Sequence, residues 1–225
     1  MTKNNFILFF LFLLPFYTIA QSLNQTDGNG QKQGKWAKFY INGVPKYEGQ
    51  FKNDKAWGEF KHYYENGRIK AISNFSSDGI ICHTKTFHEN SFPMASGKYI
   101  KQKKDSLWLY YSDINGSLVS EEMYKKGKLH GLSKTYFPDE LIIAESIEYI
   151  DGKKNGELRK YFPDGSIMTE SIYENDNLNG KFTLYHPDGS IQLNGAYRNG
   201  RQIGNWEYYD EEGKAISADE FKESN

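Results

Sequence analysis

Aromatic residues, glycines and turn-forming pairs recur along this chain every 24 or 25 residues. Eight anchor positions define the period, and most are glycine: Gly34, Gly58, Cys82, Ser106, Gly131, Gly156, Gly180 and Gly204. A first ring stands five residues after every anchor: Phe39, Tyr63, Phe87, Tyr111, Tyr136, Tyr161, Tyr185 and Tyr209. A second ring stands near the end of every copy: Phe51, Phe75, Tyr99, Tyr124, Tyr149, Tyr173, Tyr197 and Phe221. Such a period indicates an array of similar supersecondary units.

Each copy also carries a turn signal between its two rings. The pairs are Asn42-Gly43, Asn66-Gly67, Asn90-Ser91, Asn115-Gly116, Asp164-Gly165, Asp188-Gly189 and Glu212-Gly213, with Pro138-Asp139 in the fifth copy. These pairs mark β-hairpin tips, and weaker signals such as Asn199-Gly200 lead into the next copy. Because a lone hairpin is marginal in water, stability must come from the array. The sequence therefore predicts an all-β fold, an elongated antiparallel meander of about eight β-hairpin repeats in a single-layer or open curled sheet.

The turn chemistry also predicts which rings share a face. A three-residue loop at the tip places the first ring beside the aliphatic residue on the returning strand, as with Tyr161 and Ile167. Strict alternation then carries that face to the second ring. We therefore expect Tyr161, Tyr173, Tyr185 and Tyr197 to belong to one continuous aromatic ladder that forms the core.

A further set of rings is the candidate binding surface. It comprises the aromatic residues two positions after an anchor together with two neighbouring tyrosines: Trp36, Phe60, Trp108, Tyr110, Phe182, Trp206 and Tyr208. On a solvated face these rings would form a stripe suited to recognition. The alternative is that the sheet curls and buries them as a second core layer. Thr84 and Ser133 interrupt the series in two copies.

The third copy departs most from the pattern. Cys82 and Ser91 replace glycines, and Pro93 interrupts the expected second strand. One expectation is a bend or weak point between residues 82 and 106, and the other is an irregular repeat of equal stability.

The N-terminal segment has the pattern of an export signal. Lys3 precedes an apolar run from Phe6 to Leu14, which is followed by Pro15 and then by Thr18 and Ala20 at the small-residue positions expected before a cleavage site. We expect residues 1–20 to be a signal peptide cleaved after Ala20, with an uncleaved anchor as the alternative. The polar residues 21–33 are expected to form a flexible leader, and residues 34–225 the repeat domain, with repeats starting near 34, 58, 82, 106, 131, 156, 180 and 204. The predicted location is the periplasm or the extracellular space.

Composition and motifs restrict the chemistry. The chain has 28 Lys plus Arg against 29 Asp plus Glu, a balance that argues against nucleic-acid binding. His62, Cys82, His83 and His88 fall in adjacent copies but lack the paired spacing of zinc ligands. We therefore expect the histidines to be unrelated surface or strand-edge residues, and the single cysteine to be a buried, inert thiol. The sequence contains no nucleophile elbow, P-loop or dinucleotide fingerprint, so we predict no catalytic residue, no metal and no cofactor.

The repeat unit resembles a known family. The stretch from Gly195 to Gly200 that leads into Gly204 resembles MORN repeats, and the Tyr-Phe-Pro-Asp-Gly tip at residues 161–165 is similar to the bacterial MORN-variant repeat. The resemblance covers residues 34–225. It implies an open antiparallel sheet with interaction or scaffolding roles. Bacterial proteins of this kind are often labelled antitoxin components of toxin-antitoxin modules.

These observations lead to three hypotheses about function. The first is an exported, non-enzymatic module for protein-protein interaction or scaffolding, with an unidentified protein partner. The second is a glycan or cell-wall binder in which Trp36, Trp108 and Trp206 stack on sugar rings. The third is an antitoxin-like component of a toxin-antitoxin module. No nucleic-acid partner and no integral membrane segment after signal cleavage are expected.

Overall fold

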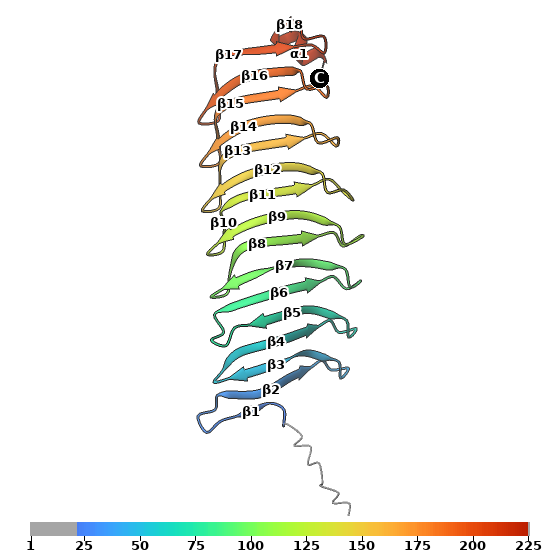
Figure 1. Ribbon diagram of the computed structural model, residues 1–225, viewed down its shortest axis with the longest axis vertical. Coiled ribbons are helices and arrows are strands. Elements are labelled where there is room, and N and C mark those ends of the chain that lie inside the picture. The colour runs from blue at the N-terminus through green and yellow to red at the C-terminus, as the bar shows by residue number, and fades with distance from the viewer. Residues whose placement is uncertain (1–21, 225) are drawn as a thin grey trace, which may run out of the picture.

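The protein forms one long antiparallel β-sheet in a computed structural model that describes residues 22–224 (Figure 1). The predicted signal peptide lies outside the described residues. Within the described part of the chain, no helix is long and apolar enough to cross a membrane. The strands lie in sequence order from β1 at one end to β18 at the other, in a single layer (Figure 1). The predicted meander of hairpins is confirmed.

Sixteen of the eighteen strands form eight two-stranded repeats. β1 precedes the first repeat, and one helix follows the last. The strands are β1 (Gln25–Thr26), β2 (Lys32–Phe39), β3 (Pro45–Lys52), β4 (Lys55–Tyr63), β5 (Ile69–Phe75), β6 (Ile81–Phe87), β7 (Pro93–Ile100), β8 (Lys103–Tyr111), β9 (Leu118–Lys125), β10 (Lys128–Leu129), β11 (Gly131–Tyr136), β12 (Ile143–Ile150), β13 (Lys153–Tyr161), β14 (Ile167–Glu174), β15 (Asn177–Tyr185), β16 (Ile191–Arg198), β17 (Arg201–Tyr209) and β18 (Ala215–Ile216). The helix is α1 (Ala218–Ser224). The extra strand is β10, which pairs with β9 just before β11 pairs with both β9 and β12.

The turns alternate between the two edges of the sheet. At the predicted tips, the glycine that ends each turn has a positive φ, as at Gly165 (87°). On the other edge, two-residue turns have positive φ at both positions, as at Asn199 (50°) and Gly200 (75°). These are the dihedral angles of type I′ turns, whose twist matches that of the flanking strands. Local turn chemistry therefore fixes the hairpin register along the chain.

In the first seven repeats the two rings lie on opposite faces of the sheet, which corrects the predicted common ladder. Tyr161 pairs with Ile167 as expected, but the next pair skips Met168, which forms a β-bulge. One extra residue reverses the alternation of every side chain that follows it. Tyr173 therefore lies on the face opposite Tyr161. The shared ladder predicted for Tyr161, Tyr173, Tyr185 and Tyr197 is wrong.

The third repeat continues the sheet without a break. β5 and β6 pair in unbroken register from Ala71 opposite Thr86 to Phe75 opposite Cys82. Gly58, the anchor of the preceding repeat, has a positive φ of 65° and sits at a bulge, whereas Cys82 does not. Because a cysteine side chain disfavours that backbone region, this repeat keeps a regular ladder instead. Pro93 begins β7 and does not interrupt it.

The ends of the array differ from its middle. β1 pairs with β2, so part of the segment expected to be a flexible leader adds a short strand. At the other end, β18 has two residues, and α1 replaces the rest of the expected second strand. Ser217 and Glu220 bond to each other's backbone N–H groups, which forms a capping box at the start of α1. The ring of Phe221 then lies 5.1 Å from that of Tyr208, centroid to centroid.

Candidate functional site

One face of the sheet carries interlocked aromatic rings, and we call it the ring face. It holds the residues two positions after each anchor and the second rings. Neighbouring rings meet edge to face, at 5.2 Å between the centroids of Phe51 and Phe60 and at 5.4 Å between those of Phe60 and Phe75. Similar pairs recur around Trp108 and Trp206. Such geometry suits the quadrupoles of aromatic rings and stabilises neighbouring repeats.

Three large rings of this face each lie over a glycine of the preceding strand. A Cβ built on Gly97 would lie 2.3 Å from the ring of Trp108, and one on Gly49 would lie 2.4 Å from Phe60. Gly195 stands in the same relation to Trp206. Where the glycine is replaced by Ser73, the residue above is Thr84, and their hydroxyl oxygens lie 2.9 Å apart. Glycine therefore accompanies the large ring at three sites, whereas Phe182 pairs with Ser171.

The structure separates the candidate binding rings into two groups. Phe60 and Trp108 are only 5% and 2% exposed, so the alternative of a buried core layer is correct for these two residues. Neither of their aromatic rings is open to a ligand. The remaining rings are half-buried: Trp36, Tyr110, Phe182, Trp206 and Tyr208. Binding by these half-buried rings stays a prediction.

The polar groups of the ring face are satisfied within it around the fourth repeat. The ammonium group of Lys104 lies 4.6 Å from the ring centroid of Trp108 and donates a hydrogen bond to the hydroxyl of Tyr110 (2.5 Å). The hydroxyl of Tyr124 donates to Glu122 (2.6 Å). Burial raises the pKa of both tyrosines and lowers that of Lys104. The polar groups in this part of the ring face therefore have their bonding partners within the face.

The opposite face, which we call the charged face, carries one continuous row of cross-strand neighbours. Each residue of the row pairs directly with the next one on the adjacent strand. The row is Ala37, Glu48, Lys61, Ile72, Lys85, Ser96, Leu109, Glu121, Lys134, Ser146, Arg159, Glu170, Thr183, Asn194 and Glu207. Sequence reasoning missed this row, because it becomes visible only once the register is known.

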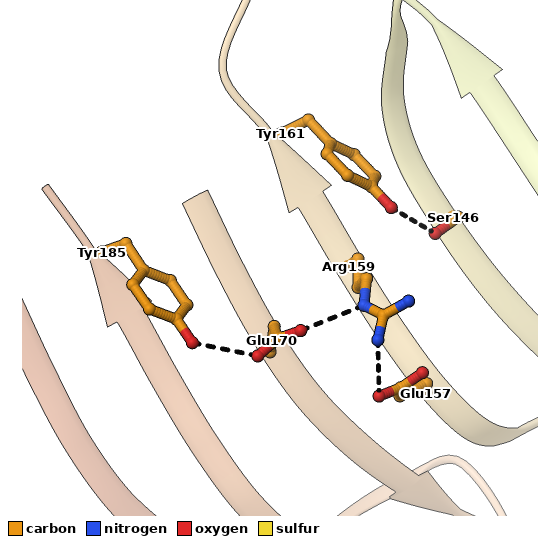
Figure 2. A network of polar contacts seen from close by, with 6 residues as sticks. All are labelled: Ser146, Glu157, Arg159, Tyr161, Glu170 and Tyr185. Carbon is orange, nitrogen blue, oxygen red and sulfur yellow. Dashed lines mark hydrogen bonds and ion pairs between the residues drawn. The ribbon is translucent and has the colours of Figure 1, made fainter. Parts of the chain in front are cut away.

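First rings of the repeats extend over the row from the tip side (Figure 2). The hydroxyl of Tyr185 donates to Glu170 (3.0 Å), and the hydroxyls of Tyr161 and Ser146 lie 3.4 Å apart. Arg159 forms ion pairs with Glu170 (3.1 Å) and with Glu157 (3.0 Å). These carboxylates raise the pKa of Arg159. The charged face therefore presents charges of both signs at fixed positions across the repeats.

The hairpin tips bond each repeat to the next. Tyr40, Tyr64, His88 and His186 all stand six residues after their anchors, and each side chain reaches a backbone carbonyl of the following repeat. The oxygen-oxygen distances are 2.9 Å for Tyr40 and 2.7 Å for Tyr64. The Nε2-oxygen distances are 3.5 Å for His88 and 3.3 Å for His186. The expectation that the histidines are unrelated is therefore wrong for this pair, whose shared position is readable from the sequence.

Candidate metal and thiol chemistry finds little support in the described residues. Among residues 22–224, no group of three His, Cys, Asp or Glu side chains is placed to hold a metal ion. Cys82 is 8% exposed, and burial raises the pKa of its thiol. It is a buried thiol, as predicted, in contact with the hydroxyl of Ser73.

The fold and its two faces define an open β-hairpin repeat protein. Three segments match the MORN repeat variant model, at residues 32–53, 58–76 and 154–175. The chain therefore carries MORN-variant repeats, as its sequence pattern indicates.

Other comparisons add little. No curated protein matches this chain. Two solved structures of TarM align with part of it: a mutant from S. aureus in complex with fondaparinux, alpha-GlcNAc-glycerol and UDP (11% identity, TM-score 0.32, 44% of this chain and 20% of that chain), and TarM itself (12% identity, TM-score 0.31, 45% and 20%). The aligned part spans a fifth of either TarM chain, and likeness at this level says nothing about function.

Proposed function

We propose that this chain is an exported, non-enzymatic repeat module that binds a protein partner along its charged face. The observation that carries the proposal is the continuous cross-strand row from Ala37 to Glu207. A single-layer sheet leaves both faces in contact with water (Figure 1). Rings on one face pack on each other, whereas the other face offers an extended surface of positioned charges. Such a surface favours recognition of a partner by charge complementarity.

The glycan-binding alternative is less well supported. Stacking on sugars requires tryptophan faces that are open and regularly spaced. Trp108 is buried under its neighbours, which leaves Trp36 and Trp206 near opposite ends of the array. Two rings so far apart do not form a continuous track for a polysaccharide.

Two lysines provide a matched test of the binding face. Lys134 lies on the charged face and pairs with Glu121 at 3.8 Å, and Lys160 lies on the ring face and pairs with Glu145 at 3.9 Å. We expect the mature chain, from residue 21 onward, to capture a specific partner from the native exported fraction. Lys134→Glu should abolish that capture, and Lys160→Glu should not. Equal capture by both variants would exclude the charged face as the binding surface.

Cell fractionation tests the export part of the proposal. The apolar run from Phe6 to Leu14 supports export, and we expect the native protein in the periplasm or the medium with residues 1–20 removed. Intact protein found in the cytosol would contradict export and would favour the antitoxin-like alternative.

A further inference from the structure

A hollow of about 560 Å³ opens on the charged face between β5 and β8. Its lining includes the basic side chains His83, Lys85 and Lys98 and an apolar part made of Ile72, Leu107 and Leu109. The volume lies within the range of about 300–1,000 Å³ typical of ligand sites. The hollow therefore has the size of a binding site, and its lining is partly basic and partly apolar.

A small side chain creates the hollow. Ser96 is the row residue between Lys85 and Leu109, and it is the smallest side chain in this part of the row. The next residue, Gly97, makes room for the ring of Trp108 on the other face and adds no side chain to this one. The short side chain of Ser96 therefore leaves a depression on the charged face.

The positive charge of the hollow is only partly balanced, because Asp105 on β8 stands directly opposite Lys98 without forming an ion pair with it. Among the described residues, no Asp or Glu lines it. Elsewhere in the row, Lys61 pairs with Glu59 at 3.1 Å and Arg159 with Glu170 at 3.1 Å. The row neighbours of Lys85 are Ile72 and Ser96, and within residues 22–224 it forms no ion pair.

A second lysine adds to this charge. Lys98 stands directly opposite His83 across β6 and β7, and opposite Asp105 across β7 and β8. Both Lys85 and Lys98 line the hollow, so an acidic ligand would meet two ammonium groups there.

The apolar part of the lining restricts the kind of anion. Leu107 is 43% exposed, and Ile72 and Leu109 are half-buried. A ligand that carried only charges would cover these side chains without gaining from their burial. A ligand with acidic and apolar groups in alternation would satisfy both the basic and the apolar residues of the lining.

We propose that this hollow binds an acidic peptide segment of the protein partner, with carboxylates toward Lys85 and Lys98 and an apolar side chain on Leu107 and Leu109. The inference rests on the proposed protein-binding function and adds the chemistry of the bound segment. A peptide in extended conformation places successive side chains on alternate sides, which suits a site that has both basic and apolar lining residues.

Binding of labelled hexapeptides to the mature chain tests the proposal. The probes are a peptide of alternating Asp and Leu, one of alternating Asn and Leu, and one of alternating Asp and Ser, followed by fluorescence anisotropy. We expect only the Asp-Leu peptide to bind well, and the double variant Lys85→Gln and Lys98→Gln to weaken its binding by about tenfold. Leu107→Ser should weaken it as well. The matched control is Lys38→Gln, a substitution of an exposed lysine on the ring face.

Several outcomes would overturn the inference. One is unchanged affinity in the double variant, and another is equal binding of the Asn-Leu peptide. Dextran sulfate, used as a polyanion without apolar side chains, should bind less tightly than the Asp-Leu peptide. If dextran sulfate binds more tightly than the Asp-Leu peptide, and Leu107→Ser does not change its affinity, the hollow would be assigned to an anionic glycan. If Lys134→Glu abolishes partner capture while the double variant does not, the proposed function stands and this inference fails.

Discussion

Replacing Gly97 with alanine tests whether each large ring depends on a glycine beneath it. The new Cβ would lie 2.3 Å from Cδ2 and 2.4 Å from Cε2 of Trp108. Carbon atoms pack favourably at about 3.5–4.0 Å, so the ring would have to move by about 1.2 Å or more. Trp108 is 2% exposed and lies 4.8 Å from Tyr99, centroid to centroid, so that movement displaces other side chains.

The magnitude follows from two opposing effects. Overpacking of a core costs about 1–3 kcal/mol. The loss of glycine flexibility in the unfolded chain returns about 0.4–1 kcal/mol. We therefore expect Gly97→Ala to lower the free energy of unfolding by about 1–2 kcal/mol, which for a chain of this size lowers Tm by about 2–8 °C. Urea unfolding followed by circular dichroism measures the change.

A control and a rescue sharpen this test. Gly28→Ala is the control, because a Cβ at that position meets no atom within 4 Å. The double variant Gly97→Ser and Trp108→Thr places the residue types of the Ser73-Thr84 pair at this site. It should be less destabilised than the sum of its two single variants. The reasoning fails if Gly97→Ala is as stable as the wild type, or if the two changes are additive.

Three further predictions concern the tips and the charged face. Tyr64→Phe removes the hydrogen bond to the carbonyl of Phe87 and should lower the free energy of unfolding by about 0.5–1.5 kcal/mol in urea titrations, whereas an unchanged value would mean that the tip bond does not hold the repeats together. Arg159→Met breaks two exposed ion pairs and should change stability by less than about 1 kcal/mol, with a smaller effect in high salt; a larger, salt-independent loss would contradict a solvated network. Burial, with the hydrogen bond to Glu48, raises the pKa of Tyr63 from 10.0 to about 12. Its neutral phenol therefore stabilises the fold fully below about pH 10, and that contribution is lost as the pH rises through about 12. Denaturation curves of wild type and Tyr63→Phe should converge over that range, and parallel curves would contradict the assignment.

The repeat and its tips could be predicted because they depend on local chemistry. Pairs such as Asp164-Gly165 specify a turn whatever surrounds them, and eight copies repeat the same signal. The distribution of rings between faces could not be predicted by alternation alone. It depends on one bulge residue, such as Met168, that has no distinctive side chain. A single inserted residue reverses a face, so the predicted ladder was wrong in the same way for the first seven repeats.

The sequence contains a constant spacing between glycines and rings, but the spacing alone did not reveal that they pair. Gly49 precedes Phe60, and Gly97 precedes Trp108, by the same eleven residues. That spacing has no meaning until the register brings the two residues together across adjacent strands. Only the packed structure could separate a role of Phe60 and Trp108 as core from a role in binding.

The pairing of strands in chain order has a mechanical consequence. Hydrogen bonds between strands run along the long axis of the molecule, so tension applied to its two ends loads one strand pair at a time. Pulling at α1 would detach Phe221 from Tyr208 and then peel β17 from β16, and each further hairpin would open in turn. Under load, the molecule would lengthen in discrete steps, as an extensible tether.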